Sequence, residues 1–163
     1  MKVIRHNEIA YPAWQASGNA ARFIMPFAKE VCIGEGYDIG CNRLEWALNG
    51  AIPVDEPFDI KSGLALPDKK VDYIFSSHCL EHIPDWVRAL DYWIAHIKTG
   101  GHLFLYLPDF SQTYWRPWNN TKHIHCFTPQ LIKAYLDNKN SCDKVFLSGV
   151  DLNHSFCALC EIS

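Results

Sequence analysis

Two nearly continuous apolar runs, joined by an amphipathic segment, constrain the fold of this chain more than any other feature. The runs are residues 71–77 (Val-Asp-Tyr-Ile-Phe-Ser-Ser) and 102–107 (His-Leu-Phe-Leu-Tyr-Leu). The segment 86–98 between them places one set of apolar side chains on a single helical face: Trp86, Leu90, Trp93, Ile94 and Ile97. Strands that are apolar throughout and linked by a helix are typical of a parallel sheet covered on both faces.

The remaining elements extend this alternation. A helix is expected over 17–31, bent or interrupted at Pro26, and another helix opens at Thr128-Pro129. Short strands are expected at 36–40 and 51–55, Thr99-Gly100-Gly101 ends the helix that starts at Trp86, and a final pair of strands covers 143–150 and 155–162. We therefore predict an α/β fold: a doubly wound, Rossmann-like, mostly parallel sheet of seven strands with an antiparallel C-terminal hairpin.

The first crossover of this sheet is unusually short. Only ten residues, Cys41 to Gly50, link the first two expected strands. A parallel crossover normally needs a dozen or more residues and usually contains a helix. The first crossover helix is therefore expected to be shortened or absent.

Length, charge and cysteine content limit the classes of protein that remain. The 163 residues fit a single domain over 1–163, with an N-terminal arm at 1–16. The net charge of −3 and the lack of a basic run disfavour a nucleic-acid partner. No apolar stretch is long enough for a membrane span, and no leader pattern opens the chain, so a cytoplasmic protein is expected. The seven cysteines are interpreted as reduced structural thiols.

Polar residues and a glycine follow the first two expected strands. Asp38-Ile39-Gly40-Cys41 follows the first strand, and Asp55 ends the second strand 17 positions after Asp38. In open α/β sheets, ligands bind outside the carboxyl ends of the strands. A glycine there lets the backbone approach a ligand closely, and an acidic side chain can accept both hydroxyls of a ribose.

Four segments resemble, in order and spacing, the class I S-adenosylmethionine-dependent methyltransferases. Residues 37–42 (Tyr-Asp-Ile-Gly-Cys-Asn) are similar to the first motif of that family, usually Asp-x-Gly-x-Gly-x-Gly. Residues 65–74 and 98–105 resemble the segments that lead into its fourth and fifth strands. Residues 76–85 resemble the Ser-x-x-x-Leu-Glu-His turn of its small, type-11-like branch, which acts on small molecules and sugars. The resemblance covers about residues 30–162.

The resemblance implies S-adenosylmethionine as the cofactor and assigns residues to it. Asp38 and Gly40 would contact the methionine moiety, Asp55 would hold the ribose, and Asp59 would border the adenine. The full set is Asp38, Gly40, Cys41, Asn42, Asp55, Asp59, Ser76, Ser77, His78 and Leu80.

The glycine motif departs from the family pattern. Asn42 and Leu44 stand where the second and third glycines usually are. Asparagine tolerates a positive φ better than most residues, so Asn42 can replace a glycine conformationally. The alternative hypothesis is a catalytically silent or cofactor-free methyltransferase-fold binding protein. A dinucleotide-dependent oxidoreductase is disfavoured, because its Gly-x-Gly-x-x-Gly loop is absent from the sequence.

The segment 108–127 exceeds the usual connection length and is expected to be a substrate or lid loop. It contains five aromatic residues, of which Tyr114, Trp115 and Trp118 are candidate substrate contacts. A base helps if the acceptor is a hydroxyl, and the candidates, in order, are His125, His123 and Asp109. Each has a structural alternative: a histidine can order the loop, and Asp109 can cap a turn.

We expect a small-molecule acceptor, more readily a hydroxyl than an amine, and leave the oligomeric state open, with a homodimer as one option. His78 and His82 flank Glu81, and a metal site formed with His123 or His125 is conceivable. Their spacing matches no established zinc pattern, so no metal is expected.

Overall fold

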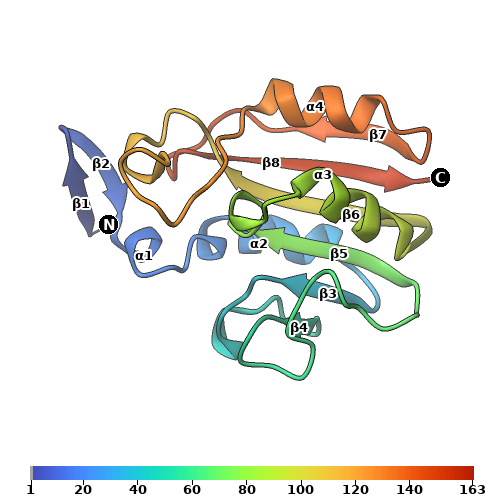
Figure 1. Cartoon of the computed structure of the whole chain (residues 1–163). Helices are drawn as coiled ribbons and strands as arrows, with labels where there is room; N and C mark the ends of the chain where they lie inside the picture. The colour runs from blue at the N-terminus through green and yellow to red at the C-terminus, as the bar shows by residue number, and fades with distance from the viewer. Residues whose placement is uncertain (1) are drawn as a thin grey trace.

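The computed structural model describes residues 2–163, and a six-stranded mixed sheet forms its centre (Figure 1). The strands are β3 (Gly36–Ile39), β4 (Ile52–Val54), β5 (Val71–Ser77), β6 (Ile97–Pro108), β7 (Cys142–Leu147) and β8 (Ser155–Ile162). Their order is β4-β3-β5-β6-β8-β7. The first four run parallel to one another, and β8 is antiparallel to both β6 and β7. The predicted parallel sheet with an antiparallel C-terminal hairpin is confirmed.

The strand count differs from the expected seven. Among residues 2–163, only Ile60 pairs with the sheet beyond the edge strand β4, through a single parallel bridge to Val54. The segment that could form an outer strand contains Pro57, Gly63 and Pro67. Proline cannot donate to a strand ladder and glycine weakens one, which explains why pairing stops after one bridge.

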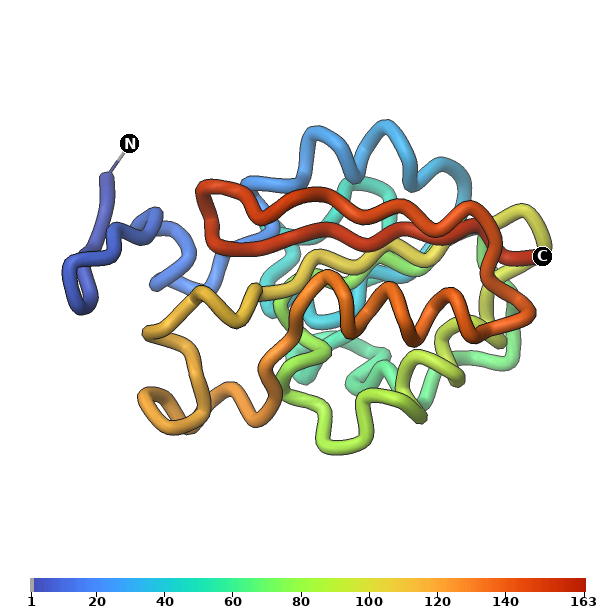
Figure 2. The backbone as a smooth tube through the Cα atoms, turned by 90° about the horizontal axis from the view of Figure 1, so that it is seen from above, coloured from blue at the N-terminus to red at the C-terminus, as the bar shows by residue number. Residues whose placement is uncertain are grey.

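Helices cover both faces of the sheet, as a doubly wound fold requires. Helix α2 (Ala21–Val31) lies on one face, and α3 (Trp86–Ala95) and α4 (Pro129–Asp137) lie on the other (Figure 2). The side chain of Asp85 caps α3 by accepting from the backbone N–H of Arg88 at 3.0 Å, and Thr128 caps α4 in the same way.

Two helix boundaries differ from the expectation. Helix α2 begins at Ala21 rather than at residue 17, and Pro26 lies inside it, so of the two expected effects of this proline the interruption does not occur. Helix α3 ends at Ala95, so that Thr99-Gly100-Gly101 belong to β6 and do not end the helix. The physical reason is that Ile97 already pairs with Val71 of β5 before the glycines are reached.

Each face of the sheet has its own apolar core. On the side of α3 and α4, the indole of Trp93 is fully buried and its Nε1–H donates to the carbonyl of Gly63 at 2.8 Å. On the side of α2, the rings of Phe75 and Phe104 pack 5.5 Å apart beneath the helix. Trp93 thereby fastens the irregular segment after β4 to the centre of the domain.

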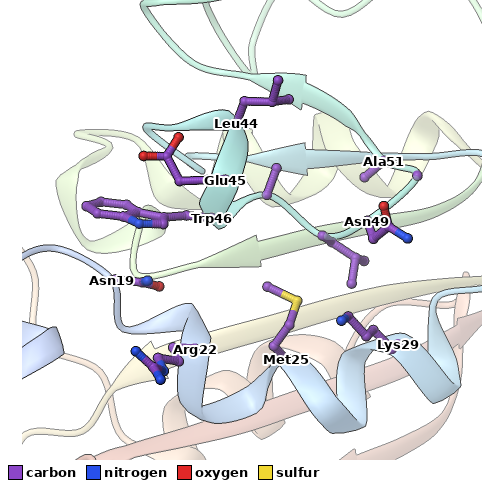
Figure 3. A pocket seen from close by; sticks show the side chains of 12 residues that line it. Asn19, Arg22, Met25, Lys29, Leu44, Glu45, Trp46, Asn49 and Ala51 are labelled. Atoms are coloured by element: carbon purple, nitrogen blue, oxygen red, sulfur yellow. The ribbon is translucent and has the colours of Figure 1, made fainter.

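The first crossover contains only a single 3-10 turn, η1 (Leu44–Trp46), which confirms the predicted loss of its helix. A groove of about 830 Å³ lies between α2 and this crossover. Arg22, Met25 and Lys29 line it from α2, opposite η1 (Figure 3). The groove thus lies beside the shortened crossover, apart from the carboxyl-end cavities described below.

The N-terminal arm and the loop 108–127 pack together at the carboxyl ends of β5 and β6 (Figure 1). The arm consists of a hairpin, β1 (Val3–His6) and β2 (Ile9–Pro12), followed by α1 (Ala13–Ala16). The hydroxyl of Tyr11 lies 3.2 Å from that of Thr113 in the 3-10 turn η3 (Thr113–Trp115). Within residues 2–163, no helix has the length and apolar character needed to cross a membrane.

Candidate functional site

Two adjacent cavities lie at the carboxyl ends of the parallel strands. The larger, of about 470 Å³, is enclosed by the ends of β3, β4 and β5, by the arm, and by the loop 108–127. The smaller, of about 280 Å³, extends toward residues 61–64. Four residues line both: Gly40, Asp55, Cys79 and His82. Their position is that expected for a ligand site in an open α/β sheet.

Gly40 allows β3 and the turn after β5 to approach each other closely. Its φ is +88°, and a Cβ built there would lie 2.4 Å from Cβ of Cys79. Its backbone N–H donates to the carbonyl of Val54 at 2.9 Å. No other residue type fits both the conformation and the space, which explains the glycine at this position.

Asp55 connects the two cavities and holds the turn after β3. One carboxylate oxygen accepts from the backbone N–H of Asn42 at 2.8 Å, and the other accepts from that of Glu56 at 2.8 Å. Asn42 has a φ of +59°, so it does adopt the conformation that a glycine usually supplies here. Both residues line the larger cavity.

Asp38 lies beneath the cavities, not in them. Its side chain is buried and accepts from the backbone N–H of Leu48 at 2.7 Å, which ties the short crossover to β3. Burial, and to a lesser degree the charge of Asp55, raises the pKa of Asp38 to about 7.

The other expected cofactor residues divide into two groups. Gly40, Asn42, Asp55 and His78 line the larger cavity. The buried residues below it are Asp38, Cys41, Ser76, Ser77 and Leu80. Asp59 is exposed and lies outside both cavities.

The structure separates the three base candidates. Nε2 of His125 lies 3.0 Å from the carbonyl of Ile83 and 3.1 Å from that of Pro84, so this nitrogen carries a proton and cannot accept one. Asp109 accepts from the backbone N–H of Ser111 at 2.9 Å, as a turn cap does. His123 alone of the three lines the larger cavity.

The three candidate aromatic contacts are also separated. Trp115 lines the larger cavity and stacks on the ring of His123, with centroids 5.1 Å apart. Tyr114 faces the arm, where it contacts the rings of His6 and Tyr11. Trp118 is 66% exposed and lies beside Phe110.

Glu81 is the main residue that the sequence analysis did not place in the site. It is fully buried, yet neither carboxylate oxygen has a hydrogen-bond partner among the described residues. Its Oε1 is approached by Nδ1 of His78 at 3.6 Å, Nε2 of His82 at 3.8 Å and Nε2 of His123 at 3.7 Å. The sequence signal was the pair of histidines that flank Glu81, with His123 or His125 as a conceivable third, and the fold brings His123 to them.

The electrostatics of this cluster follow from burial. Burial raises the pKa of Glu81 to about 8 and lowers the pKa of His78 and of His123 to about 3. The imidazoles of His78 and His123 are therefore neutral at pH 7, and each directs one nitrogen at Glu81.

The arm contributes a second unanticipated residue, Gln15. Its Nε2 donates to the carbonyl of Asn153 at 2.7 Å, whereas its buried Oε1 has no partner within residues 2–163. Gln15 lines the larger cavity, which makes this unpartnered oxygen a candidate acceptor for a ligand that donates hydrogen bonds.

Comparisons with known proteins agree with this geometry. Residues 16–140 match the sequence model of a family described as "Methyltransferase domain". Comparison with curated proteins finds no match. Among solved structures, a SAM-dependent methyltransferase from Archaeoglobus fulgidus is similar to this chain with a TM-score of 0.64 and 17% identity, covering 92% of this chain and 94% of that one.

Two further structures contain S-adenosyl-L-homocysteine (SAH). The N-methyltransferase NodS from Bradyrhizobium japonicum WM9 gives a TM-score of 0.62 at 13% identity, covering 93% of this chain and 88% of that one. The plantazolicin methyltransferase BpumL gives 0.59 at 11% identity, covering 92% and 90%. At these identities the similarity establishes the shared fold.

Proposed function

Because the chain belongs to the methyltransferase-domain family that residues 16–140 match, we propose that it transfers the methyl group of S-adenosylmethionine to a hydroxyl of a small molecule. The observation that carries this proposal is the pair of cavities joined at Gly40 and Asp55, at the carboxyl ends of β3 and β4. Similar folds in NodS and BpumL, both solved with SAH, support the choice of cofactor.

The residues present fit such a cofactor. Asp55 offers a carboxylate to the two ribose hydroxyls, and the unpartnered Oε1 of Gln15 offers an acceptor to the ammonium group. The smaller cavity includes Leu64 and Ile83, whose apolar surface suits the adenine ring. Because Gly40 has no side chain, it leaves space for the cofactor where the two cavities meet.

The chain's own contribution to the reaction is mainly positioning. S-adenosylmethionine supplies an electrophilic methyl group on a sulfonium. The arm and Trp115 line the cavity, and His123 can orient an acceptor hydroxyl through a neutral ring nitrogen. With a pKa of about 3, His123 is a weak base, so alignment of the acceptor contributes more than proton removal.

The cavity volume and the state of the cysteines support a small acceptor and a cytoplasmic location. A cavity of about 470 Å³ suits a small molecule together with part of the cofactor. All seven cysteines are free thiols, which favours the reducing cytoplasm as the place of the reaction.

Calorimetric titration with SAH tests this function. We expect the wild-type chain to bind it, and Asp55→Ala to weaken binding by about 1–3 kcal/mol, the value of hydrogen bonds to a charged group. Asp68→Ala, an exposed residue outside both cavities, is the matched control and should leave the affinity unchanged.

The same titration can contradict the proposal. If the wild-type chain shows neither heat nor a thermal shift at millimolar SAH, the cofactor-free alternative replaces the enzyme. If Asp55→Ala binds as tightly as wild type, the ribose is held elsewhere.

A further inference from the structure

We infer that Glu81, His82 and His123 form a binding site for one divalent transition-metal ion, with His78 as a fourth candidate ligand. Single ligand atoms of the first three lie within 4.8 Å of one another. Nδ1 of His78 lies 3.6 Å from the same carboxylate oxygen. The site occupies the wall of the larger cavity, which His78, His82 and His123 line.

The buried carboxyl group of Glu81 lacks a partner that a bound cation would supply. Its two oxygens are fully buried and accept no hydrogen bond from the residues that the structure describes. A buried polar group without a partner costs free energy. A cation bound to Glu81 would remove this cost, whereas the three imidazoles alone do not hydrogen-bond to it.

Hydrogen bonds to neighbouring groups aim two of the rings at Glu81. Nδ1 of His82 lies 2.5 Å from the carbonyl of Lys122 and must donate to it, which leaves Nε2 as the lone pair that faces Glu81. Metal-binding histidines are commonly oriented by donating their other N–H to a carbonyl in this way.

His78 is oriented by a second chain of hydrogen bonds. The hydroxyl of Ser155 donates to the carbonyl of Asn153 at 3.0 Å, so its oxygen is free to accept from Nε2–H of His78 at 2.9 Å. The lone pair of His78 is then on Nδ1, the atom that faces Glu81. His78 holds this position with a φ of +49°, a conformation that is unfavourable for a non-glycine residue.

Hydrogen bonds from the loop 108–127 to the backbone of Glu81 place the third ring, that of His123, beside the Glu81 carboxyl group. The backbone N–H groups of Ile124 and His125 donate to the carbonyl of Glu81 at 3.0 and 3.2 Å. Trp115 stacks on His123 and fixes the plane of its ring. The rings of His82 and His123 lie edge to face, 4.8 Å apart, with one nitrogen of each directed at Glu81.

The donor set indicates which ions fit. Imidazole nitrogens with one carboxylate suit zinc and its first-row neighbours, whereas magnesium and calcium prefer sites made of oxygen. Donors around a tetrahedral zinc ion are spaced about 3.4 Å apart, given bonds of about 2.1 Å. The distances of 3.6–3.8 Å from Oε1 of Glu81 to the three imidazole nitrogens need only a small contraction. The ligand atoms of Glu81, His82 and His123 as a set lie within 4.8 Å of one another, so the widest pair must draw together further when an ion binds. With Glu81, His82 and His123 as ligands, a tetrahedral ion would keep one position open toward the cavity, and an ion that expands to five positions would keep one open even with His78 bound.

The open position suggests the class of acceptor, and this step rests on the proposed methyl transfer. An ion at Glu81 would bind an oxygen donor of the acceptor, such as a hydroxyl beside a second oxygen, and would fix it in the larger cavity. His123 would then act on the acceptor through the ion, as one of its ligands.

Titration of the chelator-treated chain with Co²⁺, without cofactor, tests the site. We expect one Co²⁺ per chain with visible d–d absorption, displaced by Zn²⁺. Glu81→Gln and His123→Ala should each weaken binding at least about 100-fold, and Ser155→Ala about tenfold as an orienting residue. His102→Ala, on β6 and away from the cluster, is the matched control and should bind like wild type.

Several outcomes would overturn the inference. One is no stoichiometric binding by the wild-type chain. Another is binding that survives both ligand variants, or that shows thiolate charge-transfer absorption, because the sulfur atoms of Cys142 and Cys160 lie only 3.4 Å apart and could take up the ion instead. Thermal unfolding establishes that each variant is folded, and the exposed His82 offers a third ligand variant, His82→Ala.

Titration with SAH separates failure of this inference from failure of the proposed function. A chain that binds SAH but not Co²⁺ keeps the proposed function and loses the metal site. A chain that binds Co²⁺ at Glu81 but not SAH keeps the metal site alone.

Discussion

Gly40→Ala is expected to abolish measurable SAH binding and to lower the free energy of unfolding by about 2–6 kcal/mol. Two costs combine at this position. The φ of +88° is unfavourable for any residue with a Cβ, and that Cβ would lie 2.4 Å from Cβ of Cys79. Relief of the clash would displace the turn after β5, and with it His78 and His82 in the cavity wall. Chemical denaturation and calorimetry measure the two effects.

Gly50→Ala separates the two costs. Gly50 has the same φ of +88°, but no atom lies within 4 Å of the position that its Cβ would take. We expect this variant to lose only the conformational part, about 1–3 kcal/mol, and to bind SAH normally. Equal destabilisation by both substitutions would show that the contact with Cys79 is unimportant. Normal SAH binding by Gly40→Ala would contradict the placement of the cofactor beside Gly40.

The parts of the fold that local patterns determine were predictable. The apolar runs of β5 and β6 indicate by their composition that these strands are buried. The spacing of apolar residues in α3 likewise indicates which of its faces is buried. The ten-residue link after β3 was too short for a crossover helix on chain geometry alone, and the structure has a single 3-10 turn there. The positive φ of Asn42 was predictable because asparagine tolerates this conformation better than most residues.

The errors concern features that depend on partners distant in sequence. Gly100-Gly101 looked like a helix end, but Gly101 serves close strand packing: a Cβ there would lie 2.5 Å from the carbonyl oxygen of Asp72. The missing seventh strand has a similar origin, since the segment after β4 is held by the contact of Trp93 with Gly63 and not by a ladder. Neither contact has a signature in the local sequence.

The candidate site was predictable to the extent that it follows strand ends. Gly40, Asn42, Asp55 and His78 all line the larger cavity, as their positions after β3, β4 and β5 imply. Glu81 and Gln15 were missed as site residues, because their roles arise from a loop and an arm that close over the strand ends. The ranking of the base candidates stays a prediction, and only the fold shows that Nε2 of His125 faces two carbonyl groups.

Asp38→Asn is expected to change how the stability of the chain depends on pH. The folded-state pKa of Asp38, raised by burial to about 7, exceeds the ordinary value near 3.8, so the folded state retains a proton that the unfolded chain releases. The stabilisation that this proton provides is complete below about pH 4 and is lost as pH rises through 7. Asparagine resembles the protonated acid and does not titrate. Between pH 4 and 8 the wild type should therefore lose about 4 kcal/mol relative to Asp38→Asn in chemical denaturation.

Comparison with a second aspartate controls the sign of this effect. Hydrogen bonds from Lys98 and from the backbone of Glu35 lower the pKa of Asp72, so the wild type should gain stability relative to Asp72→Asn as pH rises through the acidic range. The titrations of Glu81, His78 and His123 are common to each pair of chains and cancel in the difference. A pH-independent difference for Asp38→Asn would mean that Asp38 is ionised in the folded chain. The charge of Asp55 is the second cause that raises the pKa of Asp38. In an Asp55→Ala background, the pH at which the wild-type Asp38 loses its proton in the folded state should therefore be lower. Such a shift would show that Asp55 in the cavity and Asp38, which holds the crossover, are electrostatically coupled.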